Sequence, residues 1–223
     1  MERKGSVRQI LIADAVVDRE HPVLFRQGDL DGACGLYALM MGLNLCGYVD
    51  DETSFAHEPD RRTQLGRLYK QFEDYPALFS GGSYIENLKE VLDNAYGRKI
   101  KTEFHEGNNK SIIRFTVSHL SDGHPVILGI RARGGVAHAV LACGLEFEQA
   151  TCGSARKNGE LPKPQRILIL DPGGYEAPSF IPWNSFIYPE PQFSGTYPYQ
   201  FVDGICGVHK VSFDEALALW SMG

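Results

Sequence analysis

Three short stretches of the 223-residue chain carry residue types that together could do nucleophilic chemistry. In chain order, the first holds Gln27 and Cys34, the second holds His138 and the third holds Asp171. A thiolate can attack a carbonyl carbon, an imidazole can take and return the proton, and a carboxylate can fix the tautomer of the imidazole. Each residue alone could have a purely structural role. The order of the four residue types along the chain, however, indicates acyl chemistry at a cysteine.

Cys34 lies where a glycine- and aspartate-rich stretch gives way to an apolar one, so we expect it at the start of a buried helix. The helix dipole and the N–H groups at that end favour a thiolate, and the same N–H groups could hold an oxyanion. The side-chain amide of Gln27 could be a further oxyanion donor, whereas Asp29 and Asp31 would disfavour the thiolate. The competing interpretation of Cys34 is a small buried hydrophobic residue.

His138 begins an apolar strand after a Gly-Gly pair, where it could face a cleft and transfer protons near neutral pH. His209, in the C-terminal strand region, is the other candidate for that role. Asp171 ends an apolar strand and precedes Pro-Gly-Gly, so we expect its carboxylate at a sheet edge, where it could accept the second ring N–H of a histidine. The alternatives are a histidine satisfied by a backbone carbonyl and an ordinary turn aspartate.

These motifs resemble the papain-like cysteine peptidase superfamily, and within it the bacteriocin-processing (double-glycine) peptidases. The resemblance rests on the Gln…Cys-Gly opening, the His-Ala-Val strand and the Leu-Asp-Pro strand end. It implies that Cys34 is the nucleophile, His138 the general base and acid, Asp171 the orienting residue and Gln27 the oxyanion-hole residue. In another branch of the superfamily an asparagine beside a tryptophan orients the histidine, which makes Asn184 the alternative to Asp171.

The resemblance also implies a papain-like α+β fold, with an N-terminal helical half packed on a C-terminal antiparallel β-sheet, as one domain over residues 1–223. Two features depart from the pattern. The spacing between His138 and Asp171 is longer than usual, which we attribute to a polar extension of one hairpin at about residues 147–165 that leaves the strand pairing intact. The helical region at about residues 51–96, read as an insertion, has no recognised counterpart.

The hydrophobic pattern predicts the elements that must position these residues. Helices are expected at residues 36–46, at 61–75 and from Ser83, where Ser83-x-x-Glu86 has the form of a capping box. Ser212-x-x-Glu215 has the same form, and predicts a short final helix that runs to Trp220. Strands are expected at residues 7–17, 126–130, 137–143 and 166–170. Most helices thus precede most strands, which is typical of an α+β domain.

Composition narrows the possible partners. Twenty-two Lys and Arg residues against 28 Asp and Glu give a net charge of −6, and no basic block occurs, so nucleic acid is not an expected partner. No apolar run approaches the roughly 20 residues of a membrane span, and we expect neither a membrane segment nor a signal peptide. The expected partner is a protein or peptide substrate; the sequence leaves the oligomeric state open.

The remaining cysteines indicate the compartment. Five scattered cysteines without a CxxC pair argue against a disulfide framework and a structural zinc site, so we expect no metal and no cofactor. Cys46, Cys143 and Cys206 have apolar neighbours and are expected in the core, whereas Cys152 is expected to be exposed. Reduced thiols fit a cytoplasmic protein, and equally an effector that is exported without a signal peptide.

The sequence therefore predicts a thiol peptidase that cleaves a peptide or isopeptide bond. The same residues could instead carry out glutamine deamidation, transglutamination or peptidoglycan amide cleavage, because only the acceptor and the cleft would differ. A module that binds peptides without catalysis is the alternative of a different class.

Overall fold

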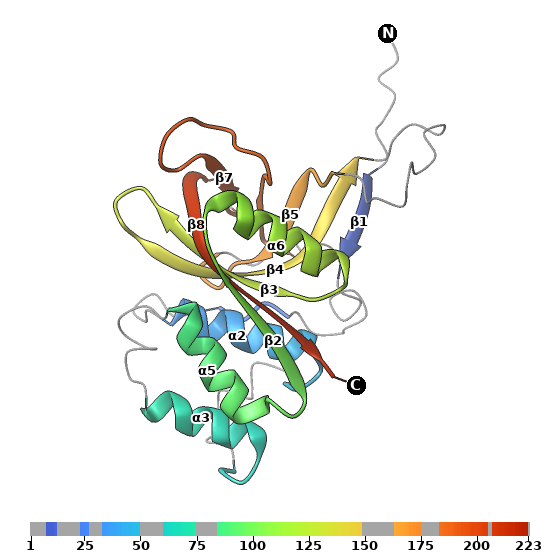
Figure 1. Ribbon diagram of the computed structural model, residues 1–223, viewed down its shortest axis with the longest axis vertical. Coiled ribbons are helices and arrows are strands. Elements are labelled where there is room, and N and C mark those ends of the chain that lie inside the picture. The colour runs from blue at the N-terminus through green and yellow to red at the C-terminus, as the bar shows by residue number, and fades with distance from the viewer. Residues whose placement is uncertain are drawn as a thin grey trace.

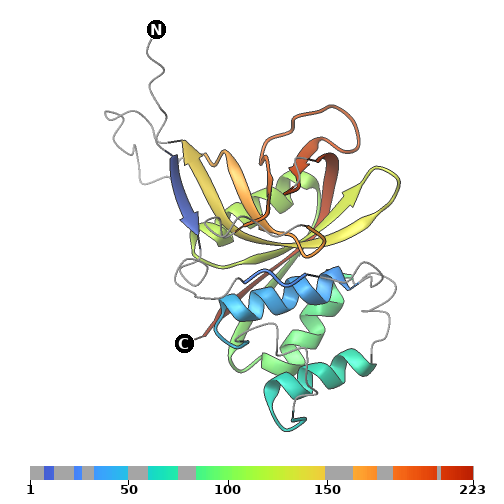
Figure 2. The same ribbon diagram turned by 180° about the vertical axis from the view of Figure 1, so that it is seen from behind.

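The computed structural model describes residues 8–12, 23–26, 33–49, 60–74, 84–148, 163–174, 183–204 and 207–222. In these ranges four helices lie beside an antiparallel sheet of eight strands (Figures 1 and 2). The helices are α2 (Cys34–Leu45), α3 (Gln64–Asp74), α5 (Ile85–Tyr96) and α6 (Asn109–Ser121). The strands are β1 (Arg8–Ile12), β2 (Ile100–Glu106), β3 (Val126–Ala132), β4 (Ala137–Glu148), β5 (Arg166–Leu170), β6 (Ser185–Ile187), β7 (Tyr199–Val202) and β8 (Val208–Ser221). This arrangement agrees with the predicted α+β class.

The sheet curls until its pairings close a ring. Strand β4 pairs with β3 and β5, β8 pairs with β3 and β7, and β6 joins β5 to β7, all antiparallel. The long strands β4 and β8 extend beyond the ring, where β1 pairs with the end of β4 and β2 with the end of β8. Because β4 and β8 belong both to the ring and to its extensions, they tie the two parts of the sheet together.

Alternating side chains of the strands form two apolar cores. On β4, Leu141 and Cys143 face the helices α2 and α5, whereas Val140 and Ala142 face the interior of the curled sheet. Helix α6 closes this second core with Ile112 and its neighbours, and α2, α3 and α5 lie on the opposite side of the sheet (Figure 1). Strands buried on both faces are therefore apolar almost throughout, as the runs at 126–130, 137–143 and 166–170 predicted.

Helix α2 is the central helix of the first core. All its residues except Tyr37 are buried, as expected from a stretch that is apolar nearly all round. Gly42 lets α2 approach the sheet closely, because a Cβ there would lie 2.9 Å from Leu219 Cδ1 of β8. Gly47 follows with a positive φ of 81°, a conformation that glycine adopts at no steric cost after a helix end. The predicted buried helix with a glycine stop is confirmed, and it starts at Cys34.

The predicted final helix is wrong, because residues 208–221 form strand β8. Leu217 and Leu219 face the helices while Ala216 and Ala218 face the second core, an alternation of period two. Pairing with β3 on one edge, and with β7 and β2 on the other, satisfies the backbone along the strand. The capping pattern Ser212-x-x-Glu215 is local, and these tertiary contacts override it.

Glu215 caps a different helix. The predicted capping box at Ser83 lies partly outside the described residues, and the N-cap of α5 is Tyr84, whose side chain makes no capping bond. Instead, the Glu215 side chain reaches from β8 to accept the N–H of Ile85 at 2.9 Å. This bond fixes the start of α5 against the sheet, next to the candidate site.

Four elements were not predicted from the sequence, namely strands β2, β6 and β7 and helix α6. Strand β2 alternates buried and exposed side chains imperfectly, and α6 carries polar residues on its outer face. Asn108 caps α6 by accepting the N–H of Ser111 at 3.1 Å. Since α6 lies between β2 and β3 in the chain, helices and strands are less segregated than predicted.

Candidate active site

Cys34, His138 and Asp171 come together at the junction of the helices and the sheet. Cys34 is the first residue of α2, His138 is the second residue of β4 and Asp171 directly follows β5. Strands β4 and β5 pair antiparallel with Leu141 opposite Leu170, so Asp171 lies beside His138 although 33 residues separate them. The expected intact pairing after the polar extension is confirmed, and residues 149–162 of that extension lie outside the described residues.

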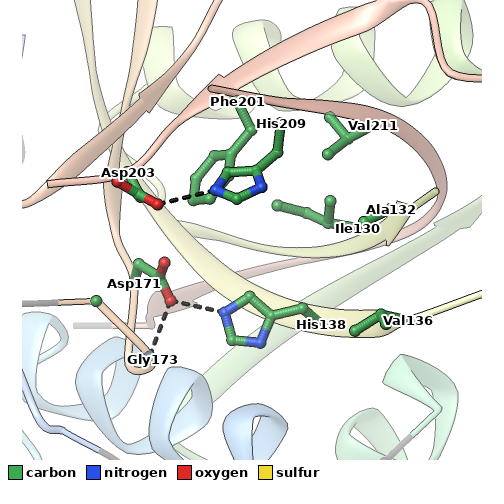
Figure 3. A pocket seen from close by; sticks show the side chains of 11 residues that line it. Ile130, Ala132, Val136, His138, Asp171, Gly173, Phe201, Asp203, His209 and Val211 are labelled. Atoms are coloured by element: carbon green, nitrogen blue, oxygen red, sulfur yellow. Dashed lines mark hydrogen bonds and ion pairs between the residues drawn. The ribbon is translucent and has the colours of Figure 1, made fainter. Parts of the chain in front are cut away.

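The three side chains form a chain of contacts. His138 Nε2 lies 2.6 Å from Asp171 Oδ1 (Figure 3), and the other side of the ring makes a hydrogen bond with the Cys34 thiol. The backbone N–H of Ala139 also donates to Cys34 Sγ, at 3.4 Å. Because Asp171 occupies Nε2, Nδ1 is the ring nitrogen that remains for the sulfur. This is the order of contacts that a nucleophile, a base and an orienting carboxylate require.

The electrostatics of the pair favour a thiolate beside an imidazolium. Burial alone would raise the pKa of Cys34, but the hydrogen bond and charge of His138 and the N–H groups of Ala139 and Gly35 lower it overall. Burial alone would lower the pKa of His138, but Asp171 and Cys34 raise it to about 10. Each partner stabilises the charged form of the other, which favours the ion pair over the neutral thiol and imidazole.

The other two described cysteines lack such an environment. Burial raises the pKa of Cys46 to about 11 and that of Cys143 to about 12, and no histidine contributes to either value. Cys143 is fully in the core, whereas Cys46 is only partly buried at the end of α2. The predicted core position holds for Cys143 and in part for Cys46, and the predictions for Cys152 and Cys206 fall outside the described residues.

A second layer of hydrogen bonds holds Asp171. The N–H of Gly173 donates to Asp171 Oδ1 at 2.9 Å. The side chain of Asn184 makes two hydrogen bonds to the backbone of Asp171. Its Oδ1 accepts the Asp171 N–H at 2.7 Å, and its Nδ2 donates to the Asp171 carbonyl at 2.9 Å. Of the two candidates for the orienting residue, it is Asp171 whose side chain contacts His138. Asn184 contacts the loop that presents Asp171, a role that the sequence did not indicate.

We expect Asp171→Ala to lower kcat by two to four orders of magnitude, because His138 then loses the group that orients it and stabilises its charge. The pKa of His138 should fall, so the alkaline limb of the activity profile should move to lower pH. Asn184→Ala should cost stability more than activity, since it removes the acceptor of the buried Asp171 N–H and one of two donors to the Asp171 carbonyl, the other being the Gly174 N–H. Kinetics across pH, with urea unfolding of both variants, would measure this. A larger loss of kcat in Asn184→Ala would reverse the assignment.

Other predicted residues lie elsewhere or outside the described ranges. Gln27, Asp29 and Asp31 fall outside them, so their predicted effects on the thiolate and the oxyanion stay predictions. His209 does not contact Cys34 but pairs with Asp203, at 2.8 Å between Nε2 and Oδ2. Its contact with Asp203 was not predicted, because Asp203 lies in the turn between β7 and β8 and has no pattern of its own.

The site opens into two hollows that share His138 and Ile130. The larger, of about 310 Å³, is lined by His138 and Asp171 on one side and by Asp203 and His209 on the other (Figure 3). The smaller, of about 170 Å³, contains Cys34. The nucleophile therefore borders only the smaller hollow, while the imidazole separates the two.

A β-bulge shapes the smaller hollow. The pairing of β3 with β8 shifts between Leu128 and Ile130, so that both Asp214 and Glu215 lie opposite Gly129. Bulges often occur beside active sites, where they redirect side chains. Both acidic residues line the hollow, and Asp214 forms an ion pair with Arg131 there. A Cβ on Gly129 would lie 3.3 Å from Ile85 Cδ1, so a side chain at this position would narrow the hollow.

Within the described ranges no three His, Cys, Asp or Glu side chains lie close enough to hold a metal ion. None of the helices that the structure describes is long and apolar enough to cross a membrane. No family model matches this chain, and no curated protein shows significant sequence similarity to it.

Proposed function

We propose that this protein is a cysteine peptidase of papain-like fold that cleaves a peptide or isopeptide bond in a protein or peptide substrate. The observation that carries the proposal is the contact chain from Cys34 at a helix N-terminus through His138 to Asp171. A buried helix with its cysteine against an antiparallel sheet that supplies the histidine and the aspartate supports a papain-like architecture. The resemblance of the three sequence motifs points the same way.

The mechanism follows from the contacts. The Cys34 thiolate attacks the scissile carbonyl carbon, and a tetrahedral oxyanion forms next to the start of α2, where helix N–H groups can stabilise it. By the resemblance, the amide of Gln27 would be a second donor to this oxyanion. His138 donates its proton to the leaving amine, the C–N bond breaks and a thioester remains on Cys34. Water, deprotonated by the now neutral His138, then attacks the thioester and releases the acid.

The proposed setting is the reducing cytoplasm. Cys34, Cys46 and Cys143 form no disulfide, and a nucleophilic thiol must stay reduced to act. An effector delivered into another cell would work under the same conditions.

A substrate screen tests the proposed reaction class. The protein would be incubated with a denatured proteome digest, with isopeptide-linked peptides and with glutamine-containing peptides, and the products identified by mass spectrometry. Peptidase activity predicts new amino termini, or a free lysine side chain from an isopeptide. Ammonia release with a mass increase of about one unit at glutamine would favour deamidation by the same residues. If no product forms while a peptide is retained on the protein, the non-catalytic peptide-binding module becomes the better interpretation.

A further inference from the structure

The smaller hollow is where a substrate would react, so an inference about its specificity rests on the proposed function. Cys34 and His138 both line this hollow. Figure 3 shows that the ring nitrogen of His138 that is not bonded to Asp171 turns away from the larger hollow. A scissile bond placed at Cys34 Sγ therefore brings a neighbouring side chain of the substrate to the smaller hollow.

The charges around the smaller hollow do not balance. Its lining contains one guanidinium, that of Arg131, and two carboxylates, those of Asp214 and Glu215. Because Arg131 forms an ion pair with Asp214, the carboxylate of Glu215 is in excess. Moving a proton between the thiol and the imidazole leaves the triad with a net charge of −1, which is that of Asp171. The surroundings of the hollow thus favour a positively charged group.

Glu215 is fixed at this hollow by its contact with α5. Its Oε2 accepts the Ile85 N–H at 2.9 Å, and a carboxylate can accept further hydrogen bonds beyond this one. Burial raises the pKa of Glu215, and the charges of Asp214 and Glu106 add to the rise, which the Ile85 N–H offsets only in part. A positive group beside Glu215 would relieve this repulsion between carboxylates.

We propose that Glu215 determines the specificity of the smaller hollow by selecting a lysine or arginine side chain next to the scissile bond. A volume of about 170 Å³ is below that of pockets for whole ligands, and suits one side chain. The apolar part of the lining, which includes Ile85, Ile130 and Ala137, can pack along the aliphatic stem of a basic side chain. Tyr84, which is 65% exposed, adds an aromatic ring to the same lining, and aromatic rings attract cations.

A peptide library tests the selection. A proteome digest made with a glutamate-specific endoproteinase keeps lysine and arginine inside the peptides. It would be incubated with the protein near neutral pH, and the cleavage sites identified by mass spectrometry after subtraction of a reaction with Cys34→Ala. We expect lysine and arginine to be enriched at least about threefold within two residues of the cleaved bond.

Charge-matched substrates then test the role of Glu215. A cleaved peptide would be compared with an analogue that has norleucine for lysine, or citrulline for arginine. We expect Glu215→Gln to lower the ratio of kcat/KM between the charged and the neutral peptide about fivefold. Glutamine removes the charge but keeps an oxygen for the Ile85 N–H. Arg131→Gln should raise the ratio, because Asp214 loses its partner.

Glu106→Gln is the matched control for the loss of one negative charge. Glu106 of β2 lies opposite Glu215 of β8, but it is not among the lining residues of the hollow. Its exposed side chain is screened by solvent, so the ratio should change less than about twofold. Circular dichroism would show whether each variant is folded; if Glu215→Gln is not, the ratio in Arg131→Gln decides alone.

The outcomes separate this inference from the proposed function. If cleavage depends on Cys34 but basic residues are not enriched, or acidic ones are, the proposed function stands and the selection by Glu215 is wrong. An equal fall of the ratio in Glu215→Gln and Glu106→Gln, or an unchanged ratio in Arg131→Gln, has the same meaning. If no cleavage depends on Cys34, the proposed function itself fails, and the inference fails with it.

Discussion

Replacing Cys34 by alanine should lower acylation by p-nitrophenyl acetate, and cleavage of any peptide substrate, by at least three orders of magnitude. Neither of the other two described cysteines has a lowered pKa, so we do not expect Cys46 or Cys143 to take over. The fold should survive, because alanine suits the first turn of a helix. The main structural cost is the lost contact between the sulfur and the Ala139 N–H, of the order of 1 kcal/mol.

Cys34→Ser is the companion variant, since its hydroxyl can still accept the Ala139 N–H but is far harder to ionise. Cys143→Ala and Cys46→Ala are the matched controls; they should keep activity and lower stability to the extent that each thiol is buried. Circular dichroism and thermal melting would confirm that each variant is folded. Substantial turnover by folded Cys34→Ala would show that Cys34 is not the nucleophile.

The parts of the fold that were predictable are those whose pattern is local. The apolar run that forms α2 and the glycine after it can be recognised without knowing any partner, and so can the two-sided apolar strands β3, β4 and β5. Strand β8 was mistaken for a helix because Ser212-x-x-Glu215 resembles a cap. Its strand character depends on pairing with β3, which is far away in the sequence.

The residues of the candidate site also fall into those that could be predicted from the sequence and those that could not. Cys34, His138 and Asp171 each stand at the end of a predictable element, so their types and order were enough to single them out. The role of Asn184 could not be predicted, because its two hydrogen bonds to the backbone of Asp171 depend on how the chain enters β6. The hollow between His138 and His209 was equally hidden, because Asp203 and His209 reach it only once β7 and β8 pair.

Alkylation of Cys34 by iodoacetamide should fall less at acidic pH than alkylation of an ordinary thiol. Only the thiolate reacts, and the contacts with His138 lower the pKa of Cys34, so at a given pH a larger fraction of Cys34 than of an ordinary thiol is thiolate. The imidazolium persists until the pH approaches its raised pKa of about 10. With pKa values raised to about 11 and 12, Cys46 and Cys143 are almost wholly protonated below pH 9. At pH 6 peptide mapping should therefore find label on Cys34 ahead of both, and ahead of Cys152.

His138→Ala should reverse this behaviour, because it removes both the hydrogen bond and the positive charge that oppose burial. The pKa of Cys34 then rises instead of falling, so labelling at pH 6 should drop at least tenfold and should increase with pH as for an ordinary thiol. His209→Ala is the matched control, since His209 pairs with Asp203 and is not in contact with the sulfur; it should leave the pH profile unchanged. Unfolding in urea should equalise the labelling of all cysteines in both proteins. If folded His138→Ala labels at pH 6 as fast as the wild type, Cys34 and His138 do not form an ion pair, and a peptide-binding module explains the fold better than a peptidase.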